Sequence, residues 1–227
     1  AAGRDTGLAM KDALAVDIPA SLAAYEAQLG RWEAARRAEA EYLRRSGARA
    51  VLSDAEPLPL EAAADAGIPS AVVSNFTWDW IVEPWAEEDP RWRRVHDRLA
   101  EAYAKATVLL RLPLGGGVPA VARSSDMPLV VRAPSRTRAD VLKEVGLDPA
   151  DPRPVAAYSF GGVDWKAGAA PAVDALEDWR FVAYVARPPG VRAEWIQLPR
   201  RSGLRHCDLV AASDVVMMKP GYGTFAE

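Results

Sequence analysis

Apolar positions in the first part of the chain alternate between helical and extended spacing. Leu22, Tyr25, Leu29 and Trp32 recur at steps of three and four, which predicts one helix over residues 19–45. The runs ARAVLSD and IPSAVVSN are short, apolar and typical of buried strands, and a helical pattern over residues 60–66 separates them. This order of strand, helix and strand predicts a βαβ unit in a parallel sheet.

A tryptophan-rich stretch follows the second predicted strand. The segment FTWDWIVEPWAEEDPRW contains two prolines and is therefore not expected to form one straight helix. Residues 94–106 have helical spacing again, and the runs ATVLLRLPL and MPLVVR are predicted strands separated by a loop.

The character of the sequence changes between about residues 132 and 154, and the strand pattern then restarts. The runs VAAYSF, RFVAYVA, EWIQLP and DVVMMK are predicted strands, and residues 137–147 form a short helix with Thr137 as its N-cap. The sequence thus predicts an α/β protein of two tandem Rossmann-like parallel-sheet domains, residues 1–132 and residues 133–227.

Composition narrows the classes of function. The 227 residues are 50% hydrophobic and 26% charged with a net charge of −3, which argues against nucleic-acid binding. No apolar run approaches the ~18 residues of a membrane helix, although peripheral association stays open. Cys207 is the one cysteine, so no disulfide can form within the chain and a reducing, cytoplasmic compartment is expected. It also has no partners at metal-ligand spacing, and we expect no metal site.

The segment DVVMMKPGYGTFAE is the strongest local candidate for a binding site. A predicted strand leads to Gly221 and Gly223, and Thr224 is expected to begin a helix, where free backbone N–H groups favour an anion. Glu227 follows three residues after Thr224, so the pair could equally be a capping box. The alternative is a site with phosphates at the Gly–Thr turn and Glu227 on ribose hydroxyls.

Two further strand ends carry weaker signals. Gly161 and Gly162 follow the strand VAAYSF and could form a ligand loop or a simple tight turn. The segment SNFTWDW mixes polar and aromatic groups at Asn75, Trp78 and Asp79, which suits a sugar with a polar rim and an apolar face, or else core packing. No P-loop, dinucleotide fingerprint or GxSxG elbow is present, which disfavours nucleoside triphosphatases, dehydrogenases and serine hydrolases.

Several segments together resemble a known family. The run VLSDAEPLPLEAAADAGIPSAVVSNFTWDWI, then LLRLPL, MPLVVR, SFGG and DLVAASDVVMMKPGYGTFAE, resembles the N-terminal glycosyltransferase-like region of plant L-arabinokinases and its stand-alone bacterial relatives. The resemblance extends over about residues 15–227. That region is similar to family 28 glycosyltransferases, whose GT-B fold has two Rossmann-like domains.

The resemblance implies that the C-terminal domain binds a nucleotide-sugar donor, commonly a UDP-sugar, which serves as co-substrate in place of a cofactor. The donor-binding residues that it implies are Gly161, Gly162, Lys219, Gly221, Gly223, Thr224 and Glu227. The glycines and Thr224 would lie near the diphosphate, Lys219 would stabilise its charge, and Glu227 would hold the ribose. Asn75, Trp78 and Asp79 would lie on the acceptor side, where a glycan or another hydroxyl compound binds.

The chain also departs from that family. Family members carry a Gly/His-rich loop after their first strand, and its histidine is the usual candidate base, so the catalytic base is expected upstream of Ala1. The second sheet is expected to continue beyond Glu227. We therefore expect a glycosyltransferase truncated at both ends, inactive as this fragment, with no kinase activity because no kinase motif is present. The alternative is a non-catalytic module that binds a sugar or a nucleotide-sugar.

Overall fold

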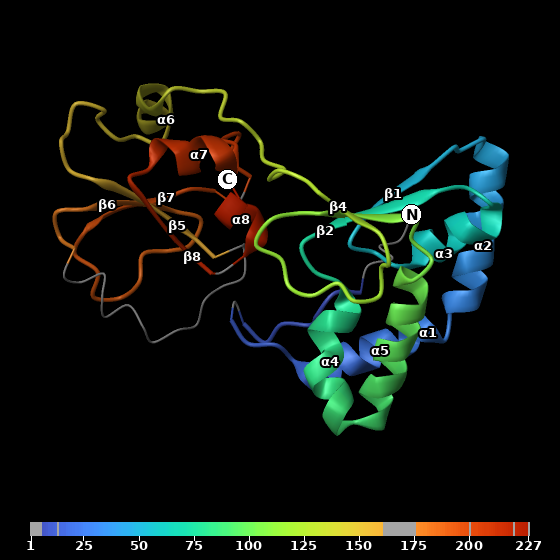
Figure 1. Cartoon of the computed structure of the whole chain (residues 1–227). Coiled ribbons are helices and arrows are strands. Elements are labelled where there is room, and N and C mark those ends of the chain that lie inside the picture. Colours follow the sequence, from blue (N-terminus) through green and yellow to red (C-terminus); the bar gives the residue numbers. More distant parts are fainter. Residues whose placement is uncertain (1–5, 13, 161–175, 200, 220, 227) are drawn as a thin grey trace. The chain divides into compact units, whose positions relative to one another are not determined.

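The computed structural model describes residues 6–12, 14–160, 176–199, 201–219 and 221–226. It divides into two compact units (Figure 1), of which unit 1 comprises Ala1–Ala9 with Val16–Leu129 and unit 2 comprises Met10–Ala15 with Val130–Glu227. Each unit holds a four-stranded parallel sheet. In chain order, helices lie between the first and second and between the second and third strands of unit 1, and between the last two strands of unit 2, so the chain is a mixed α/β protein, consistent with Rossmann-like domains.

Unit 1 has its strands in the sheet order β1-β2-β3-β4. Its elements are α1 (Ile18–Leu29), α2 (Trp32–Ser46), β1 (Val51–Asp54), α3 (Leu58–Ala66), β2 (Ser70–Ser74), α4 (Trp78–Glu88), α5 (Pro90–Tyr103), β3 (Val108–Arg111) and β4 (Ser124–Asp126). In chain order each strand therefore lies beside the next.

The single helix expected over residues 19–45 is in fact two helices. α1 ends at Leu29, and Gly30, a poor helix former, is the first residue beyond it. Trp32 then begins α2, and its side chain is 1% exposed. Gly47 and Gly67 end α2 and α3 with φ of 68° and 73°, the left-handed conformation that favours glycine at a helix end.

The tryptophan-rich stretch is broken as predicted. α4 ends at Glu88, and Asp89 begins α5 by accepting a 2.8 Å hydrogen bond from the Arg91 backbone N–H. Pro90 occupies the first position of α5, where its missing N–H costs nothing. α4 and α5 pack side by side as a helical hairpin (Figure 1).

The strand predicted at MPLVVR is wrong. The fourth strand lies just upstream, where Ser124–Asp126 pairs with β3 in the register Leu109↔Ser124. Pro128 has no N–H to donate to a sheet, and Val130 and Val131 are exposed. The apolar run therefore has no face to bury and follows the sheet as an extended segment.

A buried carboxylate joins three helices of unit 1. Glu61 of α3 accepts hydrogen bonds from Trp32 Nε1 at 2.6 Å and from both terminal nitrogens of Arg98 at 2.8 and 2.6 Å. The Arg98 guanidinium also lies 4.7 Å from the centre of the Trp32 ring. Burial raises the pKa of Glu61, but the hydrogen bonds from Arg98 and Trp32 outweigh it and the pKa is lowered.

Unit 2 has the sheet order β7-β6-β5-β8. Its elements are α6 (Arg138–Glu144), β5 (Val155–Ser159), β6 (Arg180–Ala183), β7 (Glu194–Gln197), α7 (His206–Ala212), β8 (Val215–Met218) and α8 (Tyr222–Ala226). All four strands fall within the predicted runs. Thr137 caps α6 as expected, since its hydroxyl accepts a 3.2 Å hydrogen bond from the Asp140 N–H.

The two faces of the second sheet are packed by different residues. Leu142 of α6 and Leu209 of α7 belong to the cluster that covers Ala157 and Val182, so both helices lie on one face (Figure 1). Phe181 points to the other face and stacks on Trp195 at 5.4 Å. Strands covered on both faces explain why these segments are continuous apolar runs in the sequence.

A buried guanidinium holds the amino end of this sheet. Arg180 is 1% exposed and donates hydrogen bonds to the carbonyl oxygens of Asp148, Asp151 and Arg153 at 2.7–3.2 Å. Hydrogen bonds from the Arg153 side chain and backbone lower the pKa of Asp151 to about 2. Arg180 thus ties the segment before β5 to β6.

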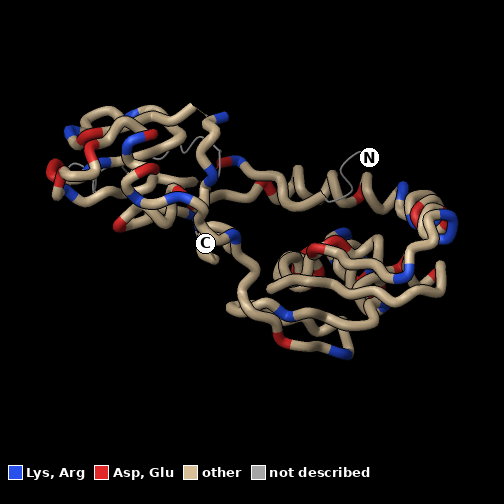
Figure 2. The backbone as a smooth tube through the Cα atoms, turned by 90° about the horizontal axis from the view of Figure 1, so that it is seen from above, with Lys and Arg blue, Asp and Glu red and all other residues tan. Residues whose placement is uncertain are grey.

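Charged residues are mixed in sign along both units. Figure 2 shows basic and acidic residues interspersed on the described backbone, without a continuous basic stripe. Among the described residues, no helix has the length and apolar character that crossing a bilayer requires.

Candidate functional site

Two candidate segments of unit 2 begin at the same edge of its sheet. β5 and β8 are parallel neighbours, with Ser159 paired to Met218 at their carboxyl ends. Beyond β5 the chain continues to Gly161 and Gly162, which lie outside the described residues. Beyond β8 it continues through Lys219 to the turn at Gly221. Ligands of open parallel sheets bind at this edge, and the register brings the ends of both strands to it.

The turn after β8 differs in detail from the prediction. The Gly221 N–H donates to the Lys219 carbonyl oxygen at 2.6 Å, and the Phe225 N–H donates to the Gly221 carbonyl oxygen at 3.1 Å. The five-residue helix α8 begins at Tyr222, so Thr224 lies inside this helix and the expectation of Thr224 as N-cap is wrong. Glu227, predicted as capping or ribose-binding residue, lies outside the described residues.

Neither described glycine of this turn is required by the packing of the turn. A Cβ at Gly223 would meet no atom within 4 Å, and a Cβ at Gly221 would meet Lys219 Cε at an ordinary 3.7 Å. Neither residue has the positive φ that favours glycine. A side chain would therefore fit at both positions, and glycine leaves the backbone open to close approach by another molecule.

Lys219 supplies positive charge at this turn. Its side chain is partly buried and lies beside Gly221. Among the residues that the structure describes, it has no carboxylate partner within ion-pair distance. An ammonium group beside a glycine backbone that another molecule can approach closely is a combination suited to an anionic ligand.

His206 lies at the same edge and was not predicted as a site residue. Its Nε2 is 2.8 Å from the hydroxyl oxygen of Ser159, the last residue of β5. His206 is the first residue of α7, the helix that precedes β8. Its position at the start of a crossover helix could have indicated a site residue, because such helices begin near the carboxyl edge of a parallel sheet. Cys207 beside it is buried, with 3% of its surface exposed.

The acceptor-side residues predicted in unit 1 differ in accessibility. Asn75 follows β2 and is partly exposed, and Trp78 packs edge to face on Phe76 with ring centres 5.0 Å apart. Asp79 is 1% exposed, and its Oδ1 is buried without a hydrogen-bond partner among the described residues. Of the predicted three, only Asn75 and Trp78 are therefore within reach of a ligand at the surface.

A glycine loop after β3 packs tightly on this strand end. The Gly116 N–H donates to the Asn75 carbonyl oxygen at 2.8 Å. A Cβ at Gly115 would lie 2.5 Å from that oxygen, and a Cβ at Gly116 would lie 2.4 Å from Trp80 Cη2. The Asn75 backbone leaves no room for a side chain at Gly115, and one at Gly116 would displace the Trp80 ring, so the loop is packed for glycine at both positions.

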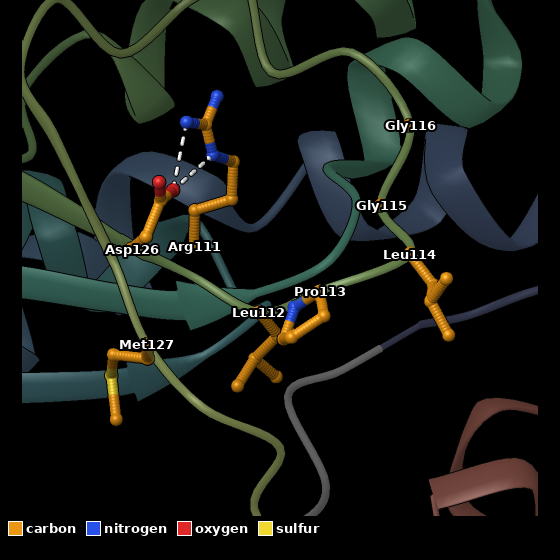
Figure 3. Close-up of a pocket in the computed structure, with 8 residues that line it drawn as sticks. All are labelled: Arg111, Leu112, Pro113, Leu114, Gly115, Gly116, Asp126 and Met127. Carbon is orange, nitrogen blue, oxygen red and sulfur yellow. Dashed lines mark hydrogen bonds and ion pairs between the residues drawn. The ribbon is translucent and has the colours of Figure 1, made fainter.

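The same loop borders a pocket of about 500 Å³ at the carboxyl ends of β3 and β4 (Figure 3). Its lining residues are Arg111, Leu112, Pro113, Leu114, Gly115, Gly116, Asp126 and Met127. Arg111 Nε donates to Asp126 Oδ1 at 2.7 Å across the two strands. This hydrogen bond and the nearby charge of Arg111 lower the pKa of Asp126. The described residues contain no cluster of His, Cys, Asp and Glu suited to a metal ion.

Comparison with known proteins finds a relative in a plant. The chain is 34% identical to L-arabinokinase from Arabidopsis thaliana over 239 aligned positions, which cover 98% of this chain and 21% of that protein. The chain thus spans about a fifth of the length of this curated relative. No family model and no solved structure matches it. The similarity to family 28 glycosyltransferases stays a prediction. Over nearly its whole length, the chain is related to one region of L-arabinokinase.

Proposed function

We propose that unit 2 binds a nucleotide-sugar, commonly a UDP-sugar, at the carboxyl edge of its sheet. The chain would then be part of a GT-B-type glycosyltransferase that transfers a glycosyl group to a hydroxyl acceptor. The observation that carries the proposal is the turn after β8. There Gly221 and Gly223 leave room that the described protein does not fill, beside Lys219, which has no carboxylate partner among the described residues.

The proposed chemistry is electrostatic. The diphosphate of a nucleotide-sugar already carries two negative charges, and breaking the bond to the sugar adds one more as the diphosphate departs. Lys219 and the backbone N–H groups of the turn would stabilise that charge as it develops. Gly161 and Gly162, which follow the neighbouring strand β5, would complete the phosphate contacts. Thr224 and Glu227 would contact the diphosphate and the ribose.

The proposed acceptor side is in unit 1. Asn75 and Trp78 offer one polar and one flat apolar group at the end of β2, a combination that suits a sugar. Asp79 would act from within the protein by orienting its neighbours, since it is 1% exposed. The name of the relative, L-arabinokinase, makes a sugar related to arabinose the first acceptor to test.

The alternative is a module that binds a sugar or a nucleotide-sugar without turnover. It uses the same donor contacts as the transferase and needs no general base. Release of UDP from a UDP-sugar in the presence of an acceptor would support the transferase. Tight binding without release would support the module.

Calorimetric titration of the chain with UDP and UDP-sugars tests donor binding. We expect Lys219→Gln to weaken the affinity for UDP about tenfold, because a charge-assisted hydrogen bond to phosphate is lost. Lys143→Gln is the matched control, since Lys143 is an exposed lysine of α6 in the same unit. Equal affinities of both variants and the unmodified chain would refute the role of Lys219.

A further inference from the structure

The pocket at the ends of β3 and β4 belongs to neither site that the sequence predicts. Its two charged side chains, Arg111 and Asp126, lie directly opposite each other in the strand register. Figure 3 shows both on the same side of the strands, opposite Leu112 and Met127. The loop from Leu114 to Gly116 borders the space beside them.

This pair leaves one carboxylate oxygen and one guanidinium nitrogen without a hydrogen bond to the described residues. Arg111 Nε and one terminal nitrogen both lie 2.7 Å from Oδ1 of Asp126. Oδ2 of Asp126 and the remaining terminal nitrogen, Nη1 of Arg111, make no hydrogen bond to any residue that the structure describes. The side chains are 50% and 75% exposed, so a ligand can reach both.

The charges decide which ligand fits. A phosphate or carboxylate drawn to Arg111 would be repelled by Asp126, and a cation drawn to Asp126 would be repelled by Arg111. Two neighbouring hydroxyl groups satisfy both, because one can donate to Oδ2 while the other accepts from Nη1. The pocket volume of about 500 Å³ lies within the range of small-ligand sites.

The backbone beside the pair is fixed in advance. Asn75 holds Gly116 by a 2.8 Å hydrogen bond, and the loop is packed for glycine at both Gly115 and Gly116. Leu114 has φ of 57°, a conformation that a leucine rarely adopts and that the surrounding loop must enforce. A fixed loop of bare peptide groups loses little entropy when it binds hydroxyl groups.

We propose that this pocket binds an uncharged monosaccharide, with Asp126 accepting from and Arg111 donating to adjacent hydroxyl groups. The inference rests on the proposed function only for the class of ligand, a sugar. It moves the acceptor contacts from the partly buried end of β2 to the neighbouring ends of β3 and β4. Asn75 and Trp80 then act as positioning residues that hold the glycine loop in place.

Two-dimensional NMR of the ¹⁵N-labelled chain tests the proposal through the amide signals of Gly115 and Gly116. The probes are L-arabinose, D-galactose, inorganic phosphate and glucuronate, each titrated to tens of millimolar. We expect the two neutral sugars to shift these signals. Asp126→Asn and Arg111→Gln should each weaken that binding about tenfold, because each removes a hydrogen bond to a charged group.

Glu41→Gln is the matched control, because Glu41 is an acid of similar exposure that forms an ion pair with Arg45 on α2. The double variant Arg111→Asp with Asp126→Arg separates binding from stability, since it keeps the cross-strand pair but exchanges donor and acceptor. We expect this variant to fold normally and to bind the neutral sugars weakly.

The proposal is overturned if neither sugar shifts the glycine signals, if Asp126→Asn binds the sugars as the unmodified chain does, or if phosphate or glucuronate binds in preference. UDP binding to unit 2 is measured on the same samples. If the unmodified chain binds UDP but neither sugar, this pocket alone is refuted, and if it binds the sugars but not UDP, the proposed donor site alone is refuted.

Discussion

The carboxyl edges of the two sheets use glycine for opposite reasons. In unit 1, Gly115 and Gly116 are pressed against Asn75 and Trp80 so closely that a Cβ would lie within 2.5 Å of another atom. In unit 2, a Cβ at Gly223 would meet nothing within 4 Å. The first pair is explained by folding alone. The second glycine has no such explanation within the described protein, and the proposed donor site assigns it to close approach of a ligand.

The two units also bury charge in different ways. Unit 1 buries a carboxylate, Glu61, between the donors Trp32 and Arg98. Unit 2 buries a guanidinium, Arg180, whose hydrogen bonds go mainly to backbone carbonyl oxygens. Both buried groups have their hydrogen bonds satisfied. Of the two, only the Glu61 carboxylate can be neutralised by acid.

The largest effect is expected from Glu61→Ala. The change leaves Arg98 and the Trp32 N–H without their shared acceptor and should lower the stability of unit 1 by about 3 kcal/mol. Hydrogen exchange of the β2 and β3 amides would measure this loss separately from unit 2. Glu33→Ala is the control, since Glu33 is 58% exposed and also contacts Arg98. Equal losses in both variants would show that the burial of Glu61 is unimportant.

Gly115→Ala tests the contrast between the glycines. Its Cβ would press on the backbone oxygen of Asn75, which cannot rotate away, so we expect a loss of about 2 kcal/mol. Hydrogen exchange of the β2 amides again reports the change. If Gly115→Ala were as stable as the unmodified chain, the tight loop of unit 1 would be disproved.

Gly223→Ala is expected to change stability in the opposite direction, leaving unit 2 as stable as before or slightly more stable. Alanine fits the open space within α8 and favours helix over glycine by up to about 1 kcal/mol, so unit 2 should melt at the same temperature or slightly higher. Thermal unfolding followed by circular dichroism measures this directly. A clear loss of stability would mean that the fold itself requires glycine there.

The smallest effect is expected from pH. The pKa of Asp151 is lowered to about 2, so its stabilising contribution is complete above its ordinary value near ~4 and is lost as the pH falls toward 2. Asp151→Asn should therefore flatten the dependence of unit 2 stability on pH across this window. An unchanged slope between pH 4 and pH 2 would contradict the pairing with Arg153.

Much of the fold could be predicted because its strands are short apolar runs. Glycines such as Gly47 and Gly67 mark where the helices before β1 and β2 end. The strand at MPLVVR was misplaced because apolar content alone does not report that Pro128 cannot pair. The break between α1 and α2 was missed because the apolar spacing of three and four continues across Gly30 to Trp32. Helical spacing is preserved there although the backbone is interrupted.

Candidate site residues could be predicted only where they lie close together in the sequence, at the end of one strand. The turn after β8 was found because its glycines stand together in the sequence. The pocket at Arg111 and Asp126 was not, because 15 residues separate them and only the register of β3 and β4 makes them neighbours. His206 was missed for the same reason, since its partner Ser159 lies on β5, 47 residues earlier in the sequence.

The most direct test of the central claim is calorimetric titration of UDP into the unmodified chain, Gly223→Ala and Gly203→Ala. Both glycines have ordinary φ and open space where the methyl group of alanine would lie, so the same substitution is compared in the same unit. We expect the unmodified chain and Gly203→Ala to bind UDP equally and Gly223→Ala to bind at least tenfold more weakly. Equal binding by all three, or no binding by any, would contradict a nucleotide-sugar site at this turn.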